Sequence, residues 1–167
     1  MPRVTHVKKA RRDYPDSGIQ KGDEYYWWQF RFGPIVRSKT PPTRSQLTKS
    51  SYLQTIYGIE DEFNKGTWAE ADDVEARVEE IKSSLDDLKS ELEGNLENMP
   101  EQLRESSSAG ELLQERIDNL DSAISELESI DVNPPDADEL KDYYDGEIQG
   151  WIDEKRDEVE QALSNLS

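Results

Sequence analysis

Residues 24–32, with the sequence EYYWWQFRF, gather six aromatic side chains and one arginine within nine positions. Consecutive side chains of a β-strand point to opposite faces, and aromatic residues favour strands. We expect the face that carries only aromatic rings to lie in the core: Tyr26, Trp28, Phe30 and Phe32. The other face is amphipathic and could meet solvent or a ligand: Tyr25, Trp27, Gln29 and Arg31. The alternative is that both faces pack, one against a helix at 45–57 and one against the N-terminal arm.

Aromatic and cationic side chains together suit nucleic acid, because rings stack on bases and cations neutralise phosphates. Trp27 is the candidate for stacking. The candidates for contacts with phosphates or base edges are Arg31, Arg37 and Lys39. Four further cations near the N-terminus would support them: Lys8, Lys9, Arg11 and Arg12. The pattern predicts a site for DNA or RNA in the N-terminal part of the chain.

The residue types present give little support to other chemistries. The chain has no cysteine and only one histidine, His6, which excludes disulfides, thiol nucleophiles and a multi-histidine metal site within one chain. His6 lies among basic residues, where it suits a surface or nucleic-acid contact. Adjacent acids such as 72–73, 79–80 and 86–87 are typical of a solvated helix face. We expect a protein that is not an enzyme, with no catalytic residues, metal or cofactor.

Charge divides the chain into two parts. Residues 1–58 hold 11 Lys/Arg and 4 Asp/Glu, a net charge of +7, whereas residues 59–167 hold 9 and 34, a net charge of −25. The first part favours a polyanionic partner, and the second would repel one unless it imitates one. No run approaches the roughly 20 apolar residues of a membrane span, so we expect no membrane contact and a cytoplasmic protein.

The pattern predicts an α+β protein with a small basic β module and one helix at 1–65, followed by an acidic helical region at 67–167. A β-hairpin is expected across 24–40, with 3–10 as an arm or first strand. Helical spacing begins at Ser45, where Gly58 could divide the helix. Gly66 is the expected stop, and Thr67 the expected N-cap of the next helix.

Three further helices are predicted at 68–99, 111–130 and 139–166. Apolar residues recur in the first of them at steps of three and four, as in a coiled-coil seam: Ala71, Val74, Val78, Ile81, Leu85, Leu88, Leu92 and Met99. The second repeats the pattern: Leu113, Ile117, Leu120, Ile124 and Leu127. The third continues it: Leu140, Tyr144, Ile148, Trp151, Ile152, Val159 and Leu163. Such seams require a partner, which is either an antiparallel hairpin or three-helix bundle within the chain, or a parallel homodimer through 68–99.

Residues 21–53 resemble the arm-type DNA-binding domain of tyrosine recombinases. The resemblance runs through Lys21-Gly22, the aromatic strand from Tyr26 to Arg31, Gly33, the segment Arg37-Ser38-Lys39-Thr40 and a helix from about Ser45. It implies a small three-stranded sheet that enters the major groove, with Arg31, Arg37 and Lys39 as contacts. Pro34 departs from the family's turn, and no recombinase catalytic constellation follows in the acidic part.

The whole chain also resembles a family of uncharacterised proteins encoded by tailed bacteriophages, through MPRVTHVKKAR, YYWWQFR and SKTPP. This resemblance implies a phage origin, and we expect the protein in the cytoplasm of the host cell. The leading hypothesis is a phage accessory protein whose N-terminal module binds nucleic acid and whose helices mediate self-association or partner binding. The acidic helices could also fold back on the module and compete with nucleic acid. The alternatives are an acidic, DNA-mimic-like interaction or anti-defence protein that engages a basic host protein, and a structural component of the virion.

Overall fold

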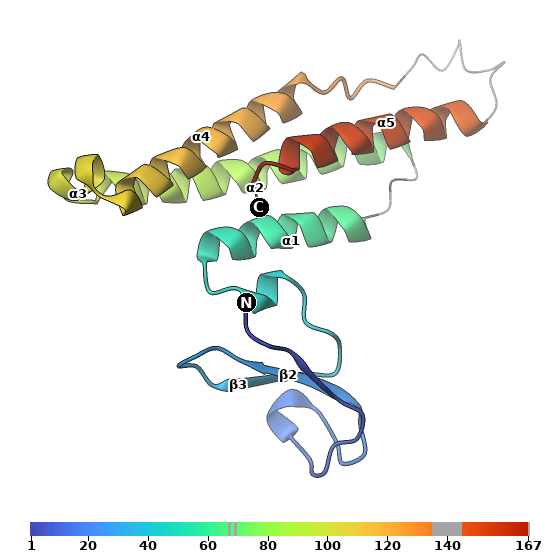
Figure 1. Cartoon of the computed structure of the whole chain (residues 1–167). Coiled ribbons are helices and arrows are strands. Elements are labelled where there is room, and N and C mark those ends of the chain that lie inside the picture. The colour runs from blue at the N-terminus through green and yellow to red at the C-terminus, as the bar shows by residue number, and fades with distance from the viewer. Residues whose placement is uncertain (67, 69, 135–144, 167) are drawn as a thin grey trace. The chain divides into compact units, whose positions relative to one another are not determined.

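The computed structural model describes residues 1–66, 68, 70–134 and 145–166 (Figure 1). The chain is α+β and divides into two compact units, Met1–Gly58 and Ile59–Ser167. This division falls inside helix α1, Ser51–Lys65, seven residues before the end of that helix. The boundary predicted from the sequence, between domains at 1–65 and 67–167, lies at the C-terminal end of this helix.

The first unit contains a three-stranded antiparallel sheet in the order β1-β2-β3. Its strands are β1 (Thr5–Val7), β2 (Tyr25–Gln29) and β3 (Ile35–Ser38), so the predicted hairpin across 24–40 is confirmed. Trp27 lies at the centre of the sheet, between Thr5 on one side and Arg37 on the other. Side chains at paired positions share one face, and the face of Trp27 therefore also carries Arg37.

The segment between β1 and β2 folds back over the face of Tyr25. The Ala10 amide donates to the Asp23 carbonyl at 2.7 Å, and the Gly22 amide donates to the Ala10 carbonyl at 2.9 Å. A short 3-10 helix, η1 (Pro15–Ser17), ends at Gly18, whose φ of 62° is the left-handed conformation that glycine adopts without a steric cost. This loop brings Ile19 onto Tyr25 and Ala10, and together they form a small buried core.

The predicted division of the aromatic strand into a core face and an open face is wrong at both ends. Tyr25, expected to be open, is buried because the loop from 10 to 23 covers it. Phe32, expected in the core, is 87% exposed because β2 ends at Gln29 and the chain turns at Gly33. Trp28 is buried on the opposite face from Tyr25, so both faces of β2 pack. This agrees with the alternative expectation, although the face of Tyr25 packs on the loop from 10 to 23.

Helix α1 begins later than predicted, after a separate 3-10 turn, η2 (Ser45–Leu47). The Ser50 hydroxyl accepts a hydrogen bond from the Leu53 amide at 3.4 Å, as an N-cap side chain does. Gly58 does not divide the helix. The helix ends at Lys65, so the predicted stop, Gly66, is the first residue after it.

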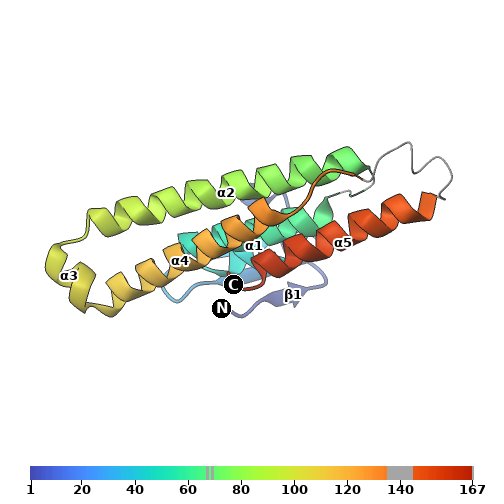
Figure 2. The same cartoon turned by 90° about the horizontal axis from the view of Figure 1, so that it is seen from above.

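The second unit contains helices α2 (Ala71–Glu97), α3 (Glu101–Ser106), α4 (Ser108–Ser129) and α5 (Asp145–Leu163). Helices α2 and α4 run antiparallel, and α5 packs against both (Figure 2). The predicted three-helix solution is therefore present within one chain. A homodimer through 68–99 would have to use another face of α2 or displace α4 and α5.

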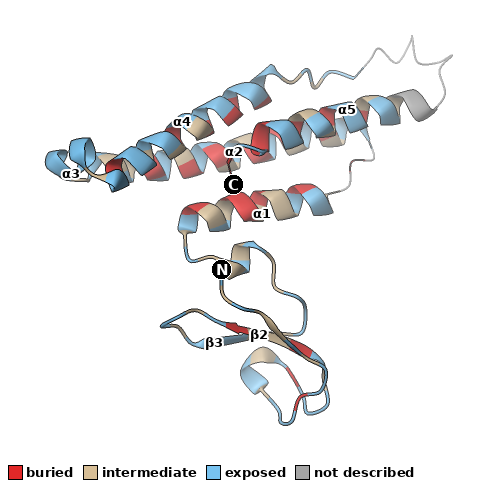
Figure 3. Cartoon of the chain, in the orientation of Figure 1, coloured by how far each residue is buried: buried red, intermediate tan, exposed pale blue. Residues whose placement is uncertain are grey.

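The predicted seams form the core of this bundle (Figure 3). Buried along α2 and α4 are Val74, Val78, Ile81, Leu85, Leu88, Leu92, Ile117, Leu120, Ile124 and Leu127. Met99 and Leu113 are half-buried. From the third predicted helix, Ile152, Val159 and Leu163 are buried and Ile148 and Trp151 half-buried, whereas Leu140 and Tyr144 lie outside the described residues.

Two local predictions in this unit need correction. The N-cap of α2 is Glu70, whose side chain accepts from the Asp73 amide while the Asp73 carboxylate accepts from the Glu70 amide at 3.1 Å. The predicted cap, Thr67, lies outside the described residues. The break at 98–110 contains the short helix α3, with Pro100 at its N-cap. Within the described part of the chain, no helix is both long and apolar enough to cross a membrane.

Candidate nucleic-acid interface

Two of the predicted cations meet on a tyrosine that the sequence analysis did not select. The Arg37 guanidinium lies 4.3 Å from the centre of the Tyr14 ring, and that of Arg12 lies 5.2 Å from it. Trp27, opposite Arg37 in the sheet, is half-buried and packs on the core around Tyr25. We call Arg12, Tyr14, Tyr25, Trp27 and Arg37 the Tyr14 cluster.

Electrostatics in the Tyr14 cluster favour negative charge at the Tyr14 oxygen. The pKa of Tyr14 is lowered because the Tyr25 hydroxyl and the Arg12 guanidinium donate hydrogen bonds toward it. The pKa of Tyr25 is raised because its proton is held in the hydrogen bond to Tyr14, and because burial disfavours its ionised form. Arg12 and Arg37 thus create a positive field at a surface ring, which is the field that a phosphate oxygen requires.

Lys39, a predicted contact, forms an ion pair within the first unit. Its ammonium pairs with the Asp23 carboxylate at 3.1 Å and so links the end of β3 to the turn before β2. The pKa of Asp23 is lowered, first by the hydrogen bond from the Gln20 amide and then by Lys39. The Lys39 side chain remains 53% exposed, so it could turn to a ligand only by giving up this surface ion pair.

Arg31 does not share a strand face with Trp27, because β2 ends two residues before it. It lies at the hairpin turn, with its guanidinium 5.2 Å from the centre of the exposed Phe32 ring. Ile35 and Val36 are also exposed, at 43% and 37%. The hairpin tip therefore carries an apolar surface beside a cation.

The remaining predicted cations follow β1. Lys8, Lys9, Arg11 and Arg12 are all exposed. Throughout the described chain, no carboxylate forms an ion pair with Lys8, Lys9 or Arg11. These cations are thus available to an anionic partner.

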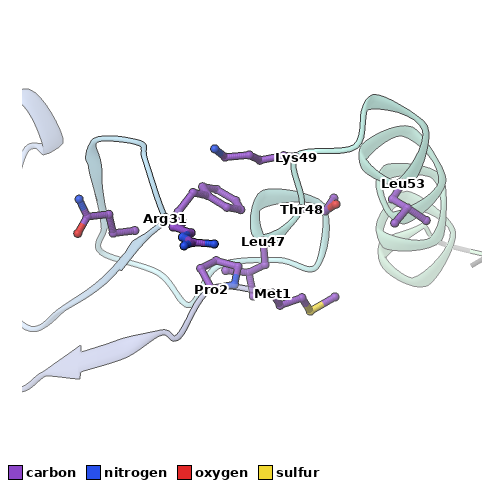
Figure 4. Close-up of a pocket in the computed structure, with 9 residues that line it drawn as sticks. Met1, Pro2, Arg31, Leu47, Thr48, Lys49 and Leu53 are labelled. Atoms are coloured by element: carbon purple, nitrogen blue, oxygen red, sulfur yellow. The ribbon is translucent and has the colours of Figure 1, made fainter.

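A groove in the first unit brings Arg31 near residues that sequence reasoning missed. It has a volume of about 620 Å³ and is lined by Met1, Pro2, Gln29, Phe30, Arg31, Leu47, Thr48, Lys49 and Leu53 (Figure 4). The Lys49 ammonium lies 5.2 Å from the centre of the Phe30 ring. No periodicity in the sequence links Lys49 to the aromatic strand, and only the fold of residues 41–50 places it there.

His6 contacts two side chains in or next to strand β2. Its ring stacks on Tyr26 at a centroid distance of 4.6 Å, and its Nε2 atom contacts the Glu24 carboxylate. Among the described residues, no group of three His, Asp or Glu side chains is arranged to hold a metal ion.

Comparison with protein-family models, with curated proteins and with solved structures gives no match for this chain.

Proposed function

We propose that the first unit binds nucleic acid without catalysing a reaction, and that the acidic helices mediate self-association or binding of a partner protein. The observation that carries this proposal is the convergence of Arg12 and Arg37 on one surface ring beside Trp27. Cations held around a half-exposed aromatic group are suited to phosphates and bases together.

Charge and topology support the proposal. The first unit has a net charge of +7, and three exposed cations, Lys8, Lys9 and Arg11, precede Arg12 in the sequence and form no ion pair with a carboxylate in the described structure. A small antiparallel sheet followed by a helix is also the arrangement expected from the resemblance to arm-type DNA-binding domains, in which the sheet enters the major groove. The resemblance to phage proteins adds the proposal that this accessory protein acts in the cytoplasm of an infected host.

The acidic bundle limits how tightly the full chain can bind a polyanion. Its net charge is −25 over residues 59–167, and its apolar seams are turned inward, so the carboxylates face outward. The bundle repels nucleic acid and could also compete for the cations of the first unit. Both effects weaken as salt screens the charges.

A second candidate function follows from the same acidic surface. An outward-facing layer of carboxylates along a helical bundle offers a basic host or phage protein a charge pattern like that of duplex DNA, which has one negative charge per ~1.7 Å. This would be an interaction or anti-defence role. A structural role in the virion ranks third, because no specific observation favours it.

Fluorescence-anisotropy titration of labelled duplex and single-stranded DNA with the full chain, at two salt concentrations, tests the proposal. We expect salt-sensitive binding that is weakened at least tenfold in the double variant Arg12→Gln/Arg37→Gln. The matched control is Arg104→Gln, an exposed arginine of α3 in the acidic unit. Absence of DNA binding, with retention of the chain on immobilised basic proteins, would instead support the second candidate.

A further inference from the structure

We infer that the groove lined by Phe30, Arg31 and Lys49 binds one unpaired nucleotide of a single-stranded nucleic acid. The base would lie on Phe30, and the phosphate would lie between Arg31 and Lys49. This inference rests on the proposed function and deepens it, because it names the form of nucleic acid that the first unit prefers.

The size and lining of the groove fit such a ligand. Its volume of about 620 Å³ lies within the usual range of small-molecule sites, roughly 300–1,000 Å³. One aromatic ring, Phe30, and several apolar side chains, among them Leu47 and Leu53, line the groove. No carboxylate lines the groove, and its two charged side chains are both cations.

The two cations are free to bind phosphate. In the described structure neither Arg31 nor Lys49 forms an ion pair with a carboxylate, and both are exposed. Lys49 already lies near the Phe30 ring, and Arg31 comes from the turn that directly follows Phe30. Arg31 and Lys49 both line the groove (Figure 4). A base that stacks on Phe30 would displace the Lys49 ammonium from the ring, which requires only a rotamer change in an exposed side chain.

The half-buried position of Phe30 makes it a suitable stacking platform. Because Phe30 is half-buried, its ring has fewer accessible orientations than the ring of Phe32, which is 87% exposed. A restricted ring loses little conformational entropy when a base stacks on it. The same position could not be reached by a base that remains stacked and paired in a duplex, because flipping it out costs a few kcal/mol. The groove therefore favours single strands.

The Tyr14 cluster and the groove have different expected selectivities. Arg12 and Arg37 act on phosphates, which duplex and single strands both carry. Phe30 acts on an unstacked base, which only a single strand or a free nucleotide offers. Variants in the two places therefore separate the inference from the proposed function.

The test compares the full-length chain with Phe30→Leu, Lys49→Gln and the control Lys21→Gln, an exposed lysine of the same unit outside the groove. The probes are a fluorescein-labelled oligothymidine and a labelled duplex of the same length. We expect Phe30→Leu to weaken single-strand binding about 5- to 50-fold and Lys49→Gln to weaken it about 3- to 10-fold. Both variants should weaken duplex binding less than about twofold. Circular dichroism verifies the folding of Phe30→Leu, and Lys49→Gln, an exposed substitution, tests the groove independently.

The outcomes are distinguishable. If wild type binds neither probe, the proposed function fails, and the inference with it. In a second outcome, wild type binds and Arg12→Gln/Arg37→Gln weakens that binding, but the groove variants bind both probes as tightly as Lys21→Gln. This outcome would overturn the inference while the proposed function stands. Thymidine monophosphate is also tested as a competitor of the labelled oligothymidine. If it displaces the probe at the same nucleotide concentration as unlabelled oligothymidine, the groove is a site for free nucleotides, and the single-strand assignment is overturned.

Discussion

Arg37 lies directly opposite Trp27 in the β2–β3 pairing, on the same face of the sheet. Its guanidinium extends to the ring of Tyr14, to which Arg12 also extends. Two cations thus meet on Tyr14, a ring that packs on the same small core as the Trp27 indole. Arg37 lies on strand β3 and is half-buried, so it has little side-chain entropy left to lose when a phosphate binds, whereas Arg12 reaches the same ring from the loop after β1.

Substitution of Arg37 should change both the strength and the salt dependence of duplex binding. For a cation that neutralises one phosphate, removal reduces the slope of log K against log salt by about 0.9. We expect Arg37→Gln to show this reduction, with roughly tenfold weaker binding at low salt. An unchanged slope would mean that Arg37 serves only to pack on Tyr14. The measurement is anisotropy titration at four or more salt concentrations.

Burial along α4 distinguishes residues that hold the bundle from residues that do not. Leu120 is fully buried, whereas Leu112 of the same helix is 44% exposed. Leu120→Ala should lower the free energy of unfolding by about 2–5 kcal/mol through lost burial and a cavity. Leu112→Ala should change it by less than about 0.5 kcal/mol. Urea unfolding followed by the helical circular-dichroism signal measures both, and equal effects would contradict the packing of α4.

Two helical glycines should respond in opposite directions to alanine. A Cβ atom at Gly110 would overlap the carbonyl oxygen of Arg104 in α3, whereas a Cβ atom at Gly94 in α2 meets nothing within 4 Å. Gly110→Ala should destabilise the bundle by about 1–3 kcal/mol, because backbone must move. Gly94→Ala should stabilise it by about 0.5–1 kcal/mol through helix propensity. Thermal unfolding of both variants tests the close approach of α3 to α4, which a stabilised Gly110→Ala would disprove.

The bundle should depend on pH in the alkaline range through Lys155. This lysine is 9% exposed, and its pKa is raised because it donates a hydrogen bond to Glu158 at 2.9 Å. A raised pKa stabilises the folded state below the unfolded-state pKa of about 10.4, and this contribution is lost as pH rises through the folded-state pKa. Glu158→Gln should therefore be less stable than wild type at pH 7–9, by about 1 kcal/mol or less because Glu158 is 37% exposed.

The stability difference between wild type and Glu158→Gln should shrink as pH rises above about 10.4. Comparing the two proteins cancels the titration of other lysines and tyrosines. Urea unfolding at pH 8, 9.5 and 11 measures the difference. If the difference in the free energy of unfolding stays constant up to pH 11, Glu158 stabilises the bundle by a route that does not depend on the charge of Lys155.

The helical bundle could be predicted because its seams repeat with the helical period. Residues such as Leu85 and Leu120 occupy the expected positions and are fully buried. The β2–β3 hairpin could be predicted from aromatic composition and the Gly-Pro turn. The loop that covers Tyr25 could not, because its fold depends on hydrogen bonds from Ala10 and Gly22 that leave no periodic pattern.

Only part of the candidate site could be predicted, because local composition reveals residue types and not the contacts that the fold makes between them. The cations and Trp27 follow from local composition, although their assignment to nucleic acid remains a prediction. The meeting of Arg12 and Arg37 on Tyr14, and of Lys49 with Phe30, depends on chain reversals between them. Phe32 is exposed because β2 ends at Gln29. The pattern of aromatic residues continues to Phe32 and therefore does not show where the strand ends.

The most direct test of the central claim is an amide and indole NMR titration of the full-length chain with oligothymidine. We predict chemical-shift changes at the Trp27 indole, at Arg37 and at residues 8–12 and 30–31, with helices α2, α4 and α5 unchanged. The Trp151 indole in α5 is the internal control. Shifts confined to the acidic helices, or no shifts at low salt, would contradict nucleic-acid binding by the first unit.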